Sequence, residues 1–195
     1  PLFLLVILAV QPYMMFFKSQ KVSDYMVTNI YGDTIRVKEL PLVLDFDKEM
    51  PKDKIVLFEK AVQNLNENLG ITAIVLSHKF VKSDFFEKFQ DGRSVIYWGN
   101  YPNSQKMFIP SEQARTSIFW VGSFVVESDL RINSEGFQNP CFDMDSLIRH
   151  ELSHALGFKH SEGLMGVSLA CDDIKPPLHS KAVAEFQSLY PNRAR

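Results

Sequence analysis

The segment RHELSHALGFKHSEGLM, residues 149–165, contains three of the five histidines of the chain. The first two, His150 and His154, are four positions apart. In an α-helix, side chains with this separation lie on the same face, so two imidazoles placed in this way can bind one zinc ion without a change in the backbone. The segment therefore predicts a metal site on a helix.

Gly157 and His160 extend this pair. A residue without a Cβ can adopt the left-handed conformation that ends a helix, so the chain can turn at Gly157 and bring His160 back as a third ligand. Three neutral ligands leave the zinc ion with its positive charge and with one position open for water. Glu151 is next to the first histidine, where it can hold this water. Because this pattern arises by chance in about one chain of this composition in 100,000, a helix that merely happens to carry histidines is the weaker interpretation.

The chain before this segment predicts a strand, a long helix and a second strand. Residues 41–47 and 71–77 are short and apolar, as buried strands are. Between them, apolar residues recur at helical spacing in a segment that starts at Pro51, which suits the first helical position, and stops at Gly70. A strand, helix and strand of this length predict a right-handed crossover between parallel strands.

Further elements lie on both sides of the histidine motif. The motif helix is predicted at about 145–157, where Asp145 can cap the next turn and Asp143 can cap or orient the helix. The predicted fold class is α+β, with an α/β-type N-terminal subdomain and one mixed, twisted sheet of about five strands. The remaining predicted elements are a short helix at 80–90, strands at 94–99, 116–122 and 124–133, and a C-terminal helix at 179–191 whose buried face comprises Val183, Phe186, Leu189 and Tyr190.

The composition fits one domain with its own core. The chain has 195 residues, 46% of them apolar, and a net charge of −2. No basic stripe indicates nucleic acid. We expect a monomer whose domain covers residues 41–195, with a cleft between 41–157 and 158–195, preceded by a linker or loosely packed lead-in at 18–40.

The first 17 residues, PLFLLVILAVQPYMMFF, form a predominantly apolar segment. They are similar to the apolar region of a secretory signal peptide. An uncleaved membrane anchor stays open, because the length is at the short limit for a span, and so does a buried strand. The first two interpretations place the rest of the protein outside the cytoplasm, as a secreted, periplasmic or extracellular protein or as one attached to a membrane.

Two cysteines, Cys141 and Cys171, flank the histidines. In an exported protein, a pair this close to one site is typical of a disulfide. Two buried free thiols, or a thiolate that blocks the metal, are the alternatives.

Several stretches of the chain carry a family resemblance. HELSHALGFKH matches the HExxHxxGxxH signature of the metzincin zinc peptidases, and Ser161 after the third histidine resembles the matrixins among them. PLVLDFDKEMPKDKIVLFEKAVQNLNENLG is similar to the first strand and long helix of a matrixin catalytic domain. SVIYW, VVESDLRIN and FDMDSLIRHE resemble the approach to the active-site helix in bacterial matrixin-like proteins, and AEFQSLYP their closing helix. The resemblance covers about residues 40–192.

The resemblance implies a metzincin-like zincin fold with a small C-terminal subdomain and zinc-dependent hydrolysis of peptide bonds in proteins. It assigns His150, His154 and His160 as ligands of one catalytic Zn²⁺, which would acidify a bound water and polarise the scissile carbonyl. It assigns Glu151 as general base and then general acid. Met165 is the candidate for the methionine turn below the metal, although it follows His160 by only five positions, a shorter gap than in matrixins. An ordinary core residue is the alternative for Met165.

A protein or peptide substrate is expected to lie extended along an edge strand, for which residues 116–122 are the candidate. Residues 164–169 would shape the pocket on the leaving-group side. A structural calcium ion is compatible with the family but not indicated by this sequence. His78 and His179 are isolated and fit surface or capping positions better than ligands.

Other classes of protein share part of this pattern. A non-catalytic zinc-containing module that binds a partner would have no chemical use for Glu151. A zinc hydrolase of small substrates fits poorly with the glycine and third histidine. An intramembrane metalloprotease would need several apolar spans, and none follows residue 17.

Overall fold

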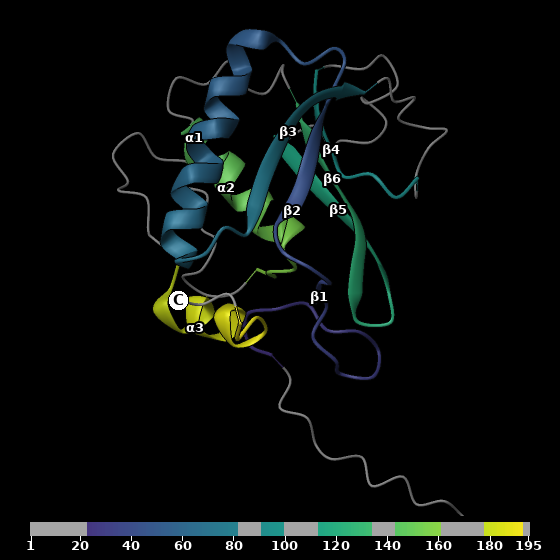
Figure 1. Ribbon diagram of the computed structural model, residues 1–195, viewed down its shortest axis with the longest axis vertical. Helices are drawn as coiled ribbons and strands as arrows, with labels where there is room; N and C mark the ends of the chain where they lie inside the picture. The colour runs from purple at the N-terminus through teal and green to yellow at the C-terminus, as the bar shows by residue number, and fades with distance from the viewer. Residues whose placement is uncertain (1–22, 82–90, 100–112, 134–142, 161–177, 193–195) are drawn as a thin grey trace, which may run out of the picture.

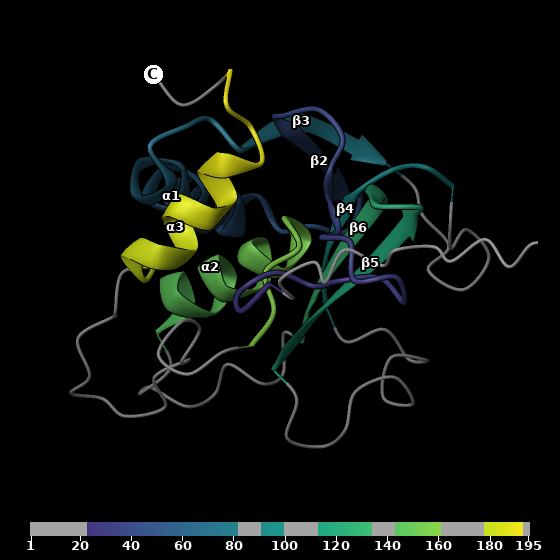
Figure 2. The ribbon, with the colours of Figure 1, turned by 90° about the horizontal axis from the view of Figure 1, so that it is seen from below.

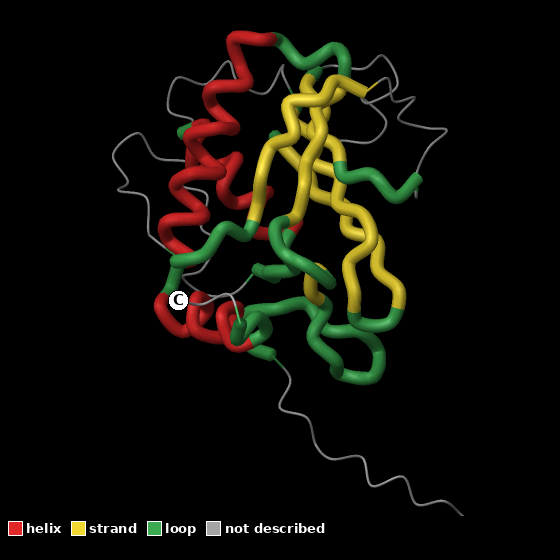
Figure 3. The backbone as a smooth tube through the Cα atoms, viewed as in Figure 1, coloured by secondary structure: helices red, strands yellow, loops and turns green. Residues whose placement is uncertain are grey.

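The computed structural model describes residues 23–81, 91–99, 113–133, 143–160 and 178–192. These residues form a mixed sheet whose face is covered by helices, so the predicted α+β class is confirmed at this level (Figures 1 and 3). The strands are β1 (Arg36–Val37), β2 (Leu42–Asp47), β3 (Ile74–Val81), β4 (Val95–Trp98), β5 (Ala114–Val121) and β6 (Phe124–Ile132), and the helices are α1 (Lys52–Leu69), α2 (Met144–Ala155) and α3 (Ser180–Ser188).

The sheet is parallel except at one edge. Its order is β3, β2, β4, β6, β5, and the short β1 pairs with the beginning of β6. Strands β2 and β3 are parallel neighbours joined through α1, which confirms the predicted connection of two parallel strands by a helix. Strand β5 runs antiparallel to β6 along its whole length, and β6 is its only strand partner among the described residues.

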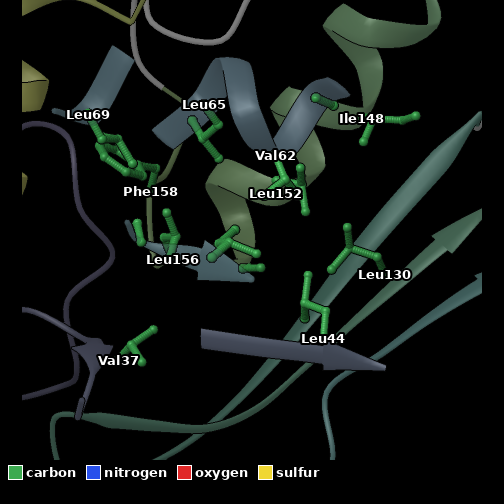
Figure 4. Close-up of a cluster of buried hydrophobic side chains, with 14 of the residues drawn as sticks. Val37, Leu44, Val62, Leu65, Leu69, Leu130, Ile148, Leu152, Leu156 and Phe158 are labelled. Atoms are coloured by element: carbon green, nitrogen blue, oxygen red, sulfur yellow. The ribbon is translucent and has the colours of Figure 1, made fainter. Parts of the chain in front are cut away.

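The core lies between the sheet and the helices. Viewed from below, α1 and α2 lie on one side of the sheet (Figure 2). Side chains from α1, α2 and the strands meet in one apolar cluster (Figure 4). Its labelled members include Leu44, Val62, Leu65, Leu130, Ile148, Leu152, Leu156 and Phe158. Burial of this size is the main source of folding free energy, and it holds α2 rigidly against the sheet.

Helix α1 has the predicted ends within one residue. It begins at Lys52, and Pro51 is its N-cap with extended backbone rather than the first helical residue. Gly70 ends it in the left-handed conformation, with φ of 65°, and donates its N–H to the Glu67 carbonyl. A left-handed residue after the last turn is the usual reason for glycine at a helix end.

Residues 23–40 are not the loosely packed lead-in that the mixed composition predicts. Met26 and Ile35 are fully buried, and Val37 in β1 belongs to the same core. The Tyr190 hydroxyl donates to the Val37 carbonyl at 2.8 Å, so the C-terminal helix also holds this segment. The prediction failed because isolated apolar residues at irregular spacing give no periodic signal.

Helix α3 packs on the same core. Phe186 and Tyr190 are buried as predicted, whereas Val183 and Leu189 are only partly buried and Ala182 takes a fully buried position. His179 is the N-cap, and its ring accepts a hydrogen bond from the Lys181 N–H, so its predicted capping role is confirmed.

Several predictions fall outside the described residues. They concern the segment 1–17, most of the short helix at 80–90, Cys141, Cys171 and Met165, and residues 164–169. Within the described part of the chain, no helix is both long and apolar enough to cross a membrane.

Strand β6 places charged side chains on the face of the sheet that turns away from the helices. The Ser128 hydroxyl donates to the Ala155 carbonyl of α2, so the alternation of a strand directs Glu127, Asp129 and Arg131 to the other face. All three are buried. Burial raises the pKa of Asp129 from 3.8 to about 7, Glu127 and Asp91 add to the rise, and the Val95 N–H and Arg131 oppose it.

A buried carboxyl with a raised pKa favours the folded state when it is protonated. Its contribution is fully present below pH 4, and it is lost as the pH rises through 7. We expect Asp129→Asn to remove this pH-dependent loss of stability, because the asparagine amide does not ionise. Its oxygen can still accept from the Val95 N–H. The free energy of unfolding of the variant relative to wild type should rise between pH 5 and pH 8, by about 2–3 kcal/mol.

Urea denaturation at both pH values measures this difference. The exposed Asp24→Asn is the control, since the same change of charge at the surface should leave the difference flat. A difference for Asp129→Asn that does not vary with pH would contradict the burial effect.

Candidate metal centre

Helix α2 carries the first two histidines and is fixed at its start by two aspartates. Asp143, not Asp145, is the N-cap, and its carboxylate accepts from the Ser146 N–H at 3.2 Å. Asp145 lies in the first turn, where it accepts from Arg149 Nε and from Asn64 Nδ2 of α1, both at 3.0 Å. Asp145 thus orients α2 against α1. The capping role that the sequence predicts for Asp145 is filled by Asp143.

The end of α2 depends on Gly157. The helix stops at Ala155, and Gly157 has φ of 95° and donates its N–H to the His154 carbonyl at 2.8 Å. A Cβ at this position would lie 2.7 Å from the Ile35 carbonyl oxygen, too close for any side chain. Glycine is therefore required twice here, for its backbone conformation, as predicted, and for the close approach of residue 35.

The chain after Gly157 is held by the N-terminal segment. The Val27 N–H donates to the Gly157 carbonyl at 2.8 Å, and the Lys159 N–H donates to the Tyr25 carbonyl at 2.9 Å. Met26 and Phe158 form the antiparallel bridge between these bonds. This pairing fixes the three residues that lead to His160, and sequence reasoning missed it.

The three histidine side chains converge. Their ligand atoms lie within 4.8 Å of one another, and this is the only group of this kind among the described residues. The Nε2 atoms of His150 and His154 are 3.1 Å apart, and those of His154 and His160 are 2.8 Å apart. Tetrahedral ligands at the usual zinc–nitrogen distance are separated by about 3.3 Å, so the spacing suits one ion with small adjustments.

The protonation state of His154 supports a cation between the rings. Its Nδ1 lies 2.9 Å from the Phe158 carbonyl, which can only accept, so Nδ1 carries the proton and Nε2 presents a lone pair to the other two rings. Burial lowers the pKa of His154 below 6.5, as does the charge of a protonated His160, although the bond to Phe158 opposes the shift. The neutral ring that results is the form that binds a metal.

Glu151 lies in the same cleft as the histidines. A cavity of about 470 Å³ is lined by the three histidines, Glu151 and residues of β5, among them Thr116 and Trp120. The Glu151 side chain is almost fully buried, with 5% exposure. Its Oε2 accepts from the Thr116 hydroxyl at 2.6 Å. The site thus combines a cation-binding cluster, a carboxylate that does not belong to that cluster, and a strand beside both.

Strand β5 borders this cleft as an edge strand. The predicted segment 116–122 overlaps Ala114–Val121, and its position at the edge agrees with the expectation for it. Thr116 was not among the predicted site residues. A threonine in a strand has no sequence signal of its own, because the residue is common there for its β-branched shape.

The other histidines and the predicted supporting residues lie elsewhere. His78 is half exposed on β3, near Glu59, and His179 caps α3, so neither joins the cluster. Met165, Cys141 and Cys171 lie outside the described residues, so their predicted roles stay predictions.

Comparisons with known proteins add no relative: no protein-family model matches the chain, and no curated protein sequence does.

The turn at Gly157 can be tested by substitution. We expect Gly157→Ala to lower the free energy of unfolding by about 1–3 kcal/mol more than Gly32→Ala. Gly32 is a matched control because its φ of 83° is also positive, but no atom lies within 4 Å of the place of a Cβ. The variant should also bind zinc at least about 10-fold more weakly, because the displaced turn carries His160.

Urea denaturation and zinc titration against a competing chelator measure the two effects. An equal stability loss for both glycines, with unchanged zinc affinity, would show that the contact with Ile35 does not constrain the site.

Proposed function

We propose that this protein is a zinc-dependent endopeptidase of the metzincin type, closest to the matrixins, that hydrolyses peptide bonds in proteins. The observation that carries the proposal is the convergence of the Nε2 atoms of His150, His154 and His160 in a cleft that also contains the buried Glu151. A purely structural zinc site usually has four protein ligands, whereas three protein ligands with a carboxylate nearby are typical of hydrolytic centres.

Each residue has a distinct part in the proposed reaction. A zinc ion bound by the three histidines would supply a Lewis acid and an acidified water. Glu151 accepts the proton of the attacking water and passes it to the leaving amine, so it acts first as base and then as acid. The Phe158 carbonyl keeps His154 in the tautomer that presents Nε2 to the centre.

The position of β5 supports a polypeptide substrate rather than a small molecule. An edge strand offers backbone donors and acceptors to which an extended chain can pair, and β5 lines the cleft beside Glu151 and the histidines. The apolar segment 1–17 supports a location outside the cytoplasm, either secreted or attached to a membrane. The finer assignment to a metzincin fold with a small C-terminal subdomain rests on the motif resemblance.

One experiment separates the peptidase from a zinc-containing binding module. Zinc is measured by elemental analysis, and cleavage of a quenched peptide library is measured on the same sample with and without a chelator. One zinc per chain with chelator-sensitive cleavage supports the peptidase. One zinc per chain without cleavage of peptides or protein favours the binding module, and no zinc overturns the assignment of all three ligands.

Replacement of the proposed base tests the chemistry. We expect Glu151→Gln to keep one zinc per chain, because residue 151 is not a ligand and an amide oxygen can still accept from Thr116. Hydrolysis should fall by at least about 100-fold, since the amide cannot take up the proton. Near-wild-type hydrolysis by a zinc-loaded variant would refute the role of Glu151.

Removal of the third histidine tests the metal site. We expect His160→Ala to weaken zinc binding by at least about 100-fold in competition with a chelator. His78→Ala is the matched control, since His78 lies outside the cluster and should leave zinc affinity unchanged. Unchanged affinity in His160→Ala would show that this residue is not a ligand.

A further inference from the structure

We infer that Thr116 is the positioning residue for Glu151: its hydroxyl holds the carboxylate of the proposed base in the orientation that the reaction needs. The inference rests on the proposed function and adds to it a residue outside the HExxHxxGxxH motif. Thr116 lies on β5 opposite Leu130 of β6, whereas Glu151 lies on α2, so the contact joins the edge strand to the motif helix.

The geometry identifies the acceptor of the hydroxyl proton. Thr116 Oγ1 lies 2.6 Å from Glu151 Oε2 and 3.0 Å from the Glu151 carbonyl oxygen. A hydroxyl has one proton, and a distance of 2.6 Å is typical of an O–H donor on an ionised carboxylate. The carboxylate is therefore the main acceptor of the Thr116 hydroxyl proton.

The contact restricts a long side chain with several rotatable bonds. A glutamate loses substantial rotamer entropy when it is fixed, and a proton transfer needs donor and acceptor within hydrogen-bond distance. A carboxylate fixed before the substrate binds has no such entropy left to lose during the reaction. Loss of the hydroxyl removes this restraint, so the carboxylate should spend less time in the reactive orientation and the turnover number should fall.

The same strand has two functions in this arrangement. Strand β5 is the proposed partner of the substrate backbone, and through Thr116 it also sets the position of the base. The same strand would thus position both the scissile bond and the carboxylate. A threonine with a purely structural role would affect stability only. A positioning residue links the orientation of the carboxylate to the strand that is proposed to bind the substrate.

Two substitutions separate the hydroxyl from the shape of the side chain. Thr116→Val keeps the branched shape that suits a strand and removes the donor, whereas Thr116→Ser keeps the donor and removes a methyl group. We expect Thr116→Val to lower kcat about 10-fold with KM within about 2-fold of wild type and one zinc per chain. Thr116→Ser should restore most of the activity.

Two further variants complete the design. Ser77→Ala is the matched control: it also removes a hydroxyl that donates to a carboxylate, that of Asp45, but Ser77 lies on β3 at the other edge of the sheet and does not line the cleft. Its kcat should be unchanged. In the Glu151→Gln background, Thr116→Val should cause no further loss of the residual activity, because Thr116 acts through the carboxylate.

A measurement without activity tests the contact itself. In urea denaturation of the zinc-free protein, Thr116→Val should lower the folding equilibrium constant at least about 5-fold more in wild type than in Glu151→Ala. Equal losses in both backgrounds would overturn the contact. Thr116→Val with wild-type kcat, or Thr116→Ser as impaired as Thr116→Val, would overturn the positioning role. A wild-type protein that binds zinc but cleaves nothing would refute the proposed function and with it the catalytic role, and the stability measurement would still decide on the contact.

Discussion

The close approach of the Ile35 carbonyl to Gly157 is the constraint on which the arrangement of the site depends. A side chain at residue 157 would push the two backbones apart, and both the pairing of Val27 with Gly157 and that of Lys159 with Tyr25 would be lost. These bonds fix the backbone just before His160. The third histidine is thus placed by a segment that itself adds no side chain to the cluster.

The first two histidines depend on a different part of the molecule. His150 and His154 are on a helix whose apolar face, with Ile148 and Leu152, is buried in the core, and whose first turn is bound to α1 through Asp145 and Asn64. Glu151 points from the same helix to β5. The site therefore lies where the helical layer, the edge strand and the N-terminal segment meet. The helices position His150 and His154, the edge strand contacts Glu151, and the N-terminal segment holds the backbone before His160.

The sequence predicts the local parts of this arrangement well. A helix with histidines one turn apart, a glycine that ends it and a strand, helix and strand before it all follow from patterns within about twenty residues. The predicted N-cap of α2 is two residues too late, because Asp143 and Asp145 are equally good caps in the sequence. The α+β class agrees with the structure at the level of a sheet covered by helices, and β5 lies at an edge of the sheet as expected.

Contacts between distant segments could not be predicted in this way. The pairing of residues 25–27 with 157–159 has no periodic signature, and the bond between Thr116 and Glu151 joins residues of which only one belongs to a motif. The raised pKa of Asp129 likewise follows from burial beside Glu127 and Asp91, which becomes visible only when the strands are assembled.

The contact between the Lys159 side chain and the Ser23 carbonyl joins positions that are 136 residues apart in the chain. During synthesis on the ribosome, β1 can pair with β6 as soon as residues 124–125 are available, whereas Ser23 has to wait for Lys159, 136 residues later in the chain. A nascent chain that is shorter than this has neither His160 nor the backbone that positions it. The turn at residues 157–159 can therefore pair with residues 25–27 only after strands β1–β6 and α2 have been made, so this pairing cannot guide the early folding of the sheet.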